Sequence, residues 1–345
     1  MLGVLCSSAP HKSKAQRQAD ALADTLERGP DVPDAERITP RDVQPPQRWT
    51  IGAGYRFQPS SRLFIGTVEQ KPSPTNPLKN VSHLFDISIE RQLTDRFSAT
   101  MSLPVAFAYR NQPYVPSGQF HVNSIGDLTV GGRAWLFRQP TEGGGNIALG
   151  MSLKLPTGAY NATGLARNAR GQTITATADQ SIQAGDGGAG FAIDTQAYQP
   201  IGWKSMLYLS GSYLFNPRNT NGVDSTRIRF RETVLSVPDQ YLVRGGIARA
   251  VPKLPGMAIT FGGRWEGVPV RDLLGKSDGF RRPGYAISAE PGFLYSRWGY
   301  VFSCNVPIAI ERNLRRSVPE IENGFRDGSA AFADYIVILG FSRRF

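Results

Sequence analysis

The chain has 345 residues, of which 40% are hydrophobic, with a mean hydropathy of -0.28 and a formal net charge of +11. No stretch approaches the roughly 18 consecutive apolar residues of a transmembrane helix, which excludes a helical membrane protein. The arginines are spread along the sequence rather than gathered in a recognisable nucleic-acid-binding module, so we expect no nucleic-acid partner.

The first 47 residues differ from the rest of the chain. Residues 1–47 are polar, weakly helical and then rich in proline, and we expect a partly helical or disordered periplasmic segment without membrane structure. Residues 1–9 are either the remnant of a signal peptide whose start lies upstream or a plain disordered terminus. Cys6 in this segment and Cys304 far downstream imply no disulfide framework.

From Trp49 onward, apolar and polar residues alternate with the period of two that is typical of half-buried β-strands. Leu103 and Val105, for example, share one parity, and Ser102 has the other. The pattern predicts strands of about ten residues, a length that crosses a bilayer at a tilt of about 45°. We expect twelve of them, at 49–57, 84–92, 97–110, 127–137, 146–156, 190–199, 205–215, 240–250, 257–267, 285–295, 299–311 and 330–345.

The connections between these strands alternate in length. Short ones are expected at 93–96, 138–145, 200–204, 251–256 and 296–298, and long ones at 58–83, 111–126, 157–189, 216–239, 268–284 and 312–329. Outer-membrane barrels have short periplasmic turns and long extracellular loops, and an even strand number places both ends on the periplasmic side. The sequence therefore predicts an all-β fold: a closed antiparallel up-and-down transmembrane β-barrel of about 12 strands over residues 48–345, in the bacterial outer membrane.

Aromatic residues gather near the predicted strand ends, where amphipathic rings favour the headgroup level. The expected periplasmic girdle is Trp49, Phe97, Tyr295, Tyr300, Phe341 and Phe345. The expected extracellular girdle is Tyr55, Phe57, Phe107, Tyr109, Tyr213, Phe215, Tyr241, Trp265 and Tyr285.

The last strand ends on Phe345, and a barrel must close its last strand on its first. We therefore predict backbone pairing between 335–345 and 49–57. In bacterial outer-membrane barrels a terminal Phe is also the signal for the barrel assembly machinery, so we expect that machinery as a partner, together with outer-membrane lipid.

If the apolar parity faces lipid, the other parity lines the lumen, because an Arg or Lys facing lipid near the midplane costs about 2–4 kcal/mol. Basic residues come mainly from early strands and acidic ones from later strands, which would orient a polar solute. The alternative is that these groups pair and fill the interior. The predicted lumen-lining residues are Arg56, Glu90, Arg110, Arg133, Lys154, Asp194, Arg244, Arg264, Glu266, Glu290 and Glu311.

No catalytic, cofactor-binding or metal-binding motif stands out, and we expect neither an enzyme nor a cofactor. A lipid hydrolase would need Ser, His and an orienting group projecting together from neighbouring strands. The histidines available to the barrel are His83 and His121, and neither lies in such an arrangement.

Two adjacent stretches carry a family resemblance. The segment from Gly126-Asp127-Leu128 to Arg133 and the segment from Asn146 to Lys154-Leu155-Pro156-Thr157-Gly158 form a hairpin that opens on GDL and closes on KLPTG. This hairpin resembles the outer-membrane transporter family named after the meta pathway of phenol degradation. The resemblance implies an outer-membrane barrel that passes small, often aromatic, compounds.

We accordingly expect a porin-like channel or transporter for passive passage of small solutes, hydrophobic or aromatic ones among them. One alternative is an outer-membrane barrel enzyme acting on lipid, which would depend on His83 or His121. The other is a structural or adhesive barrel that works through its long loops, chiefly 157–189 and 216–239.

Overall fold

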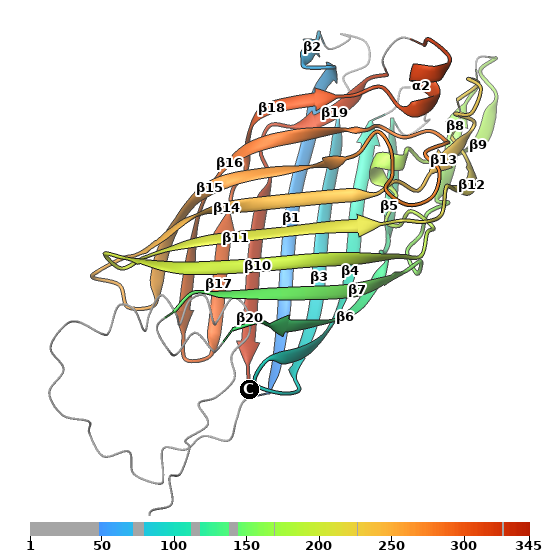
Figure 1. Cartoon of the computed structure of the whole chain (residues 1–345). Coiled ribbons are helices and arrows are strands. Elements are labelled where there is room, and N and C mark those ends of the chain that lie inside the picture. Colours follow the sequence, from blue (N-terminus) through green and yellow to red (C-terminus); the bar gives the residue numbers. More distant parts are fainter. Residues whose placement is uncertain are drawn as a thin grey trace, which may run out of the picture.

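The computed structural model describes residues 48–71, 79–111, 118–137, 144–168, 170–225, 227–325 and 328–345, which form one closed β-barrel (Figure 1). The predicted segment 1–47 and most of the predicted turn 138–145 lie outside the described residues. In the described part of the chain, none of the helices has the length and apolar character needed to span a bilayer.

The prediction of a closed antiparallel barrel of 12 strands is confirmed. Each wall strand pairs with its neighbours in sequence, and β15 pairs with β16 to complete the ring. Nine wall strands are single elements: β1 (Trp49–Ile65), β3 (Asn80–Gln92), β4 (Phe97–Asn111), β7 (Asn146–Leu155), β10 (Gly190–Gly202), β11 (Ser205–Phe215), β14 (Gln240–Ala250), β15 (Met257–Val268) and β16 (Gly284–Arg297).

The other three wall strands are each interrupted once. They are β5 (Gln119–Ile125) with β6 (Leu128–Trp135), β17 (Tyr300–Asn305) with β18 (Ile308–Leu314), and β19 (Ala330–Ala333) with β20 (Val337–Arg344). Residues 119–125, which we expected in a loop, instead continue the wall, because they pair with the end of β4 from Val105 to Asn111. Beyond the bilayer a strand needs no apolar outer face, so hydropathy patterning alone underestimates strand length there.

The barrel closes where the sequence predicted. β20 pairs with β1 from Thr50↔Arg344 to Phe57↔Val337. The backbone N–H of Trp49 and that of Phe345 each donate to the other residue's carbonyl at 3.0 Å. The predicted seam between 335–345 and 49–57 is therefore confirmed.

The long connections carry secondary structure of their own at one end of the barrel. They contain β2 (Val68–Gln70), the hairpin β8 (Thr163–Arg167) and β9 (Thr173–Thr177), the 3-10 turn η2 (Gln180–Ile182), the pair β12 (Thr220–Asp224) and β13 (Val234–Ser236), and α2 (Val318–Glu322). The short turns, including 251–256, lie at the opposite end (Figure 1). We refer to these as the extracellular and periplasmic ends.

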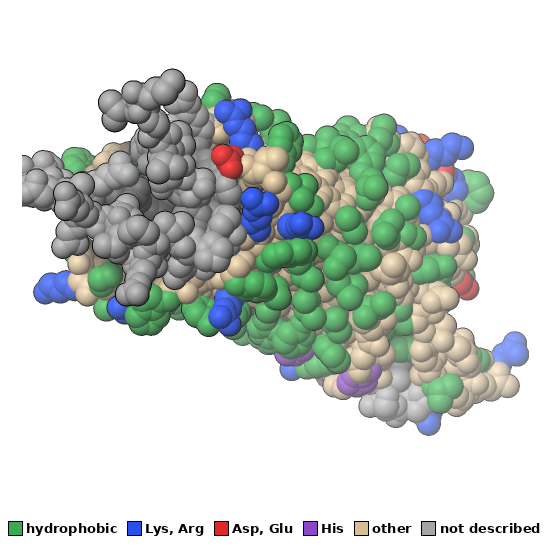
Figure 2. All heavy atoms as spheres, turned by 90° about the horizontal axis from the view of Figure 1, so that it is seen from below, with side chains coloured by type: hydrophobic (Ala, Val, Ile, Leu, Met, Phe, Trp, Pro, Cys, Tyr) green, Lys and Arg blue, Asp and Glu red, His purple; other side chains and the backbone are tan. Residues whose placement is uncertain are grey.

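The outer face of the wall is apolar, as an interface with lipid requires. Figure 2 shows hydrophobic side chains spread over the barrel wall. Met151 is 62% exposed and Phe261 is 59% exposed, while the neighbouring Lys154 and Arg264 are 6% exposed. A closed barrel with this outer face is an outer-membrane protein.

Candidate functional site: the barrel interior

The interior of the barrel holds a cluster of five charged side chains: Arg56, Arg244, Arg264, Glu266 and Glu290, called the charge cluster here. Arg244 Nη2 lies 2.5 Å from Glu290 Oε1, and Arg264 Nη2 lies 2.6 Å from Glu266 Oε2. Arg56 Nη2 lies 3.8 Å from Glu266 Oε2. Because β1 and β15 are separated in the ring by β16, β17 and β20, that last contact crosses the interior of the barrel.

A second ion pair joins Arg133 on β6 to Asp194 on β10, with Nη2 and Oδ1 3.0 Å apart. The two strands flank β7, so the side chains must reach across it. Gly150 of β7 lies between them, and a Cβ at this position would occupy the space of the Asp194 carboxylate. The glycine therefore permits this pair to form.

The hairpin motif that carries the family resemblance is a compact structural unit. The backbone N–H of Gly158 donates to Asp127 Oδ1 at 2.9 Å, and the Thr157 hydroxyl donates to the Gly126 carbonyl at 3.0 Å. Lys154 Nζ contacts the Asp186 carboxylate and lies 3.7 Å from Asp127 Oδ2. Since Asp186 precedes β10, Lys154 fixes the end of the long loop 157–189 to the top of the β6–β7 hairpin.

The same loop is fixed across the extracellular mouth by Arg110, Asp179 and Arg282, called the loop clamp here. Arg282 donates to both Asp179 oxygens, at 2.9 and 2.8 Å. Arg110 Nη1 lies 3.4 Å from Asp179 Oδ1. Arg110 belongs to β4, whereas Arg282 directly precedes β16 on another side of the ring, so Asp179 and the adjoining η2 lie over the mouth.

The clamp is held by charge in a buried setting. Burial alone would raise the pKa of Asp179, but the charges and hydrogen bonds of Arg282, with the charge of Arg110, outweigh burial and hold that pKa far below its usual range. Asp179 therefore stays ionised at every physiological pH. Bidentate guanidinium–carboxylate pairs also have a defined geometry, which fixes the position of the loop.

A cavity of 740 Å³ lies between the loop and the charge cluster. Gln180, Ser181 and Gln183 line it from the loop, and Arg56, Arg264 and Glu266 line it from the wall. One further side is apolar and is formed around the interruptions of β17–β18 and β19–β20: Pro307, Ala309, Ala330, Ala331, Phe332, Ala333, Tyr335 and Ile336. The volume is within the range of small-molecule sites.

Toward the periplasmic end the interior is packed with apolar side chains. Trp135 and Tyr198 meet edge to face with ring centroids 5.8 Å apart, and Met206 packs with them. Small residues of neighbouring strands, Ala148, Ala248, Ala250 and Ala258, complete this apolar cluster. Trp135 has the same parity as the inward-facing Arg133, and its packing against Tyr198 explains why an aromatic residue faces the interior here.

The remaining two predicted lumen residues lie apart from these groups. Glu90 on β3 is partly buried and pairs in register with Thr50, near the periplasmic end. Glu311 differs from the prediction, because it is exposed on the outer face and accepts a hydrogen bond from Tyr285 at 2.8 Å. A bulge at Ile310, opposite the Ile287–Ser288 step, shifts the parity of β18 and turns Glu311 outward.

Strand parity missed three functional candidates, Asp179, Asp186 and Arg282. All three lie in connections, where no periodicity indicates direction. Both barrel histidines have a hydrogen-bond partner. His83 Nδ1 lies 2.8 Å from the Tyr55 hydroxyl, and His121 Nε2 lies 3.1 Å from Gln119 Oε1. Within the described ranges, no group of three His, Cys, Asp or Glu side chains is placed to hold a metal ion.

No family model matches the sequence, and no curated protein matches it. Among solved structures, the barrel is similar to the COG4313 outer membrane channel from Pseudomonas putida F1, with a TM-score of 0.60 and 14% identity over 90% of this chain and 100% of that chain. It is also similar to the toluene transporter TbuX of Ralstonia pickettii, with a TM-score of 0.43 and 9% identity over 87% and 90% of the two chains.

A third similar structure is the beta domain of the Bordetella autotransporter BrkA, with a TM-score of 0.48 and 12% identity over 86% of this chain and 100% of that domain. At these identities the likeness shows the fold, that of outer-membrane barrels. It agrees with the outer-membrane barrel fold that the resemblance of the GDL and KLPTG segments implies.

Proposed function

We propose that the protein is a passive outer-membrane channel for small solutes, which bind on the way in the cavity between the loop clamp and the charge cluster. The observation that supports this most is the cavity of 740 Å³, which has charged side chains on one wall and apolar side chains on another. A structural barrel has no need for such a space. The likeness to a barrel named as an outer membrane channel supports the same function.

The proposed lumen-lining groups are those of the charge cluster, together with Arg133, Asp194 and Glu90. The charge cluster has three guanidinium groups and two carboxylates and hence a net charge of +1. A constriction with a net positive charge favours anions. The apolar wall, with Phe332 and Tyr335, suits a hydrophobic or aromatic part of the same solute. Small aromatic carboxylates combine both features.

The channel function is tested by conductance in planar lipid bilayers. We expect ion currents from the wild type, and longer or larger openings from Asp179→Asn, because the amide no longer holds two guanidinium groups over the mouth. Glu311→Gln is the matched control, since it removes a carboxylate from the outer face and should leave the currents unchanged. A barrel that is ion-tight in both the wild type and Asp179→Asn would refute the channel.

The solute class is tested by current block. Benzoate should interrupt the current at lower concentration than acetate, because only benzoate offers a ring to the apolar wall. Equal block by the two anions would leave a channel but remove the proposed preference for aromatic solutes. A barrel that conducts nothing yet binds a partner through loops 157–189 and 216–239 would instead support the adhesive alternative.

The proposal assigns no catalytic role. The ring contacts of His83 and His121 with Tyr55 and Gln119 do not include a serine hydroxyl, so the described residues form no Ser–His pair at either histidine. Phospholipid turnover by the purified barrel that disappears in His83→Ala or His121→Ala would overturn this assignment.

Recognition of Phe345 by the barrel assembly machinery stays a prediction. The residue is 49% exposed and pairs with Trp49 at the seam. Phe345→Ala should lower the amount of folded protein in the outer membrane, measured by heat-modifiable gel mobility. Unchanged amounts would show that the barrel assembly machinery does not recognise Phe345.

A further inference from the structure

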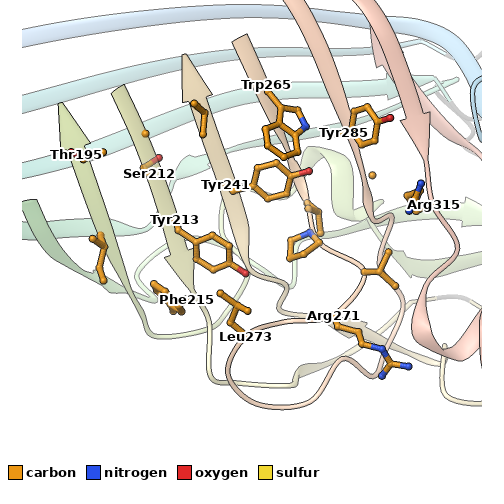
Figure 3. Close-up of a pocket in the computed structure, with 17 residues that line it drawn as sticks. Thr195, Ser212, Tyr213, Phe215, Tyr241, Trp265, Arg271, Leu273, Tyr285 and Arg315 are labelled. Carbon is orange, nitrogen blue, oxygen red and sulfur yellow. The ribbon is translucent and has the colours of Figure 1, made fainter. Parts of the chain in front are cut away.

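A groove of 890 Å³ lies on the outside of the barrel at its extracellular rim (Figure 3). Its floor consists of outward-facing side chains of β10, β11, β14 and β15, which include Ile193, Tyr213, Val243 and Trp265. The segment 269–273, which follows β15, covers one edge. Tyr213, Tyr241, Trp265 and Tyr285 come from successive strands, so the groove lies at the level of the extracellular aromatic girdle.

The wall beneath the groove is closed. Thr195 pairs with Gly211, Gly211 with Val243, and Val243 with Trp265, so the backbone ladder is continuous across the floor. The groove therefore opens toward the membrane and not into the lumen. The absence of a side chain at Gly211 deepens the floor between Thr195 and Val243.

The covering segment is fixed in place by buried polar contacts. Arg281 donates to both oxygens of Asp272, at 2.7 and 2.6 Å, and both side chains are fully buried. The backbone N–H of Leu273 donates to Asp239 Oδ2 at 2.9 Å, and Tyr213 donates to the same oxygen at 2.9 Å. The groove therefore has a defined shape, because Tyr213 of its floor and Leu273 of its cover donate to the same carboxylate oxygen of Asp239.

Two cations border this apolar surface. Arg271 and Arg315 line the groove, and both are exposed. Within the described residues, neither guanidinium has an ion pair or a side-chain hydrogen bond. Of the nearby acids, Asp272 is paired with Arg281, and Glu311 and Asp239 accept hydrogen bonds from the Tyr285 and Tyr213 hydroxyls. An apolar groove below two guanidinium groups that have no ion pair is complementary to a lipid with an anionic headgroup.

We propose that this groove binds a phosphorylated glycolipid of the outer leaflet, of the lipid A class. An acyl chain would lie against Val243, Trp265 and Leu273, and Arg271 and Arg315 would hold the phosphates. The position supports this occupant, because the girdle places the apolar floor at acyl depth and the arginines at headgroup depth on the extracellular side. Guanidinium groups also match the geometry of phosphate oxygens.

The test measures lipid bound to the purified full-length protein by native mass spectrometry. The probes are lipid A with two phosphates, the same lipid after removal of its phosphates, and phosphatidylglycerol, each added from detergent micelles. The wild type should retain lipid A in preference to the other two. Arg271→Gln with Arg315→Gln should reduce this retention by roughly 30-fold, given about 1 kcal/mol for each arginine at an anionic surface.

Arg249→Gln is the matched control, because Arg249 is also exposed but lies at the periplasmic end of β14. It should bind lipid A like the wild type. Gel mobility before and after heating shows whether each variant is folded. Equal retention of the dephosphorylated lipid, equal retention of phosphatidylglycerol, or undiminished binding by the folded double variant would each overturn the proposal.

Discussion

The two ends of the barrel interior are filled by different kinds of interaction. At the extracellular end, Asp179 holds a loop over the mouth through Arg110 and Arg282. At the periplasmic end, Trp135 and Tyr198 pack among small residues of the wall itself. The loop also packs against the wall, because Ile182 lies in one buried apolar cluster with Ala108 and Phe120. Breaking the clamp should therefore loosen the loop while the strand pairing of the wall stays intact. Apolar packing between wall strands cannot be removed without weakening the wall, so we expect the extracellular end to be the one that opens.

The largest effect should come from Asp272→Ala, which breaks the buried pair with Arg281 in the extracellular network. Removing one partner of a buried ion pair typically costs about 3–5 kcal/mol because the other charge stays buried and unpaired. We expect the segment around Arg271 to open, and trypsin to cleave there much faster, while the barrel stays folded.

The double variant Asp272→Leu with Arg281→Leu is the control for this reading. With both charges replaced by apolar groups, cleavage should be slower than in Asp272→Ala. Equal cleavage in wild type and Asp272→Ala would show that this pair does not hold the segment.

Trp135→Ala at the periplasmic end should have a somewhat smaller effect on stability, and it should act on the whole barrel and not on one loop. Truncating a buried Trp costs about 3 kcal/mol or more. Here the loss should lower the unfolding midpoint of the whole barrel in urea and also widen the lumen, which conductance would report. A variant with unchanged stability but larger currents would contradict the coupling of this cluster to the wall.

The contrast between wall and loops also explains what could be predicted from the sequence. The membrane-spanning part of each wall strand follows from period-two patterning, because the lipid imposes one apolar face there, and the seam at Phe345 follows from the need to close the barrel. The inward direction of Arg56, Arg244 and Arg264 follows from the same patterning rule. The extension at 119–125 was missed because it carries no apolar outer face of this kind. Glu311 was misplaced because one bulged residue, Ile310, reverses parity, and a bulge leaves no mark on the hydropathy pattern.

The closure of the mouth could not be predicted in this way. Asp179, Asp186 and Arg282 lie in loops, and their contacts join residues far apart in the chain, as Asp179 and Arg282 do across 103 positions. The sequence predicted that Lys154 lines the lumen but could not predict its ion-pair partner, for the same reason. Its strand parity indicated an inward direction, but only the folded loop brings Asp186 to its ammonium group.

A smaller effect is expected within the charge cluster, between the two ends. Glu266→Gln removes one of two carboxylates and should raise the anion preference of the current, whereas Arg56→Gln should lower it. A unit charge acting over about 4 Å through water contributes about 1 kcal/mol, so the permeability ratio should change by roughly two- to five-fold. Reversal potentials in a salt gradient measure this change. Shifts of the same sign in both variants would contradict the assignment of these residues to the ion path.

The smallest effect concerns pH at the extracellular end, where two buried acids behave oppositely. Burial and the neighbouring Glu320 raise the pKa of Glu232, whereas the pKa of Asp179 is held far below its usual range. The stability that depends on neutral Glu232 is complete below the pKa of an unfolded Glu and declines as pH rises toward the folded value. The contribution of Asp179 is present above the pKa of an unfolded Asp and is lost only under stronger acid. Between pH 5 and 8, therefore, the Glu232 region should respond, whereas the contribution of Asp179 should stay constant.

Hydrogen exchange of residues 227–236 and 317–322 at pH 5 and pH 8 tests this difference. In the wild type, protection should fall by roughly five-fold at the higher pH, because the buried Glu232 carboxyl ionises there. This factor corresponds to the cost of about 1 kcal/mol for a buried polar group without a suitable partner. Glu232→Gln should keep the protection constant, because the amide does not ionise. Glu322→Gln, at an exposed position of α2, removes the ion pair with Arg231 and should lower the protection at both pH values, but it should keep the pH dependence of the wild type. Loss of protection around Asp179 between pH 5 and pH 8 would contradict this assignment. It would show that the loop clamp does not stay ionised over this range and does not keep the extracellular mouth closed.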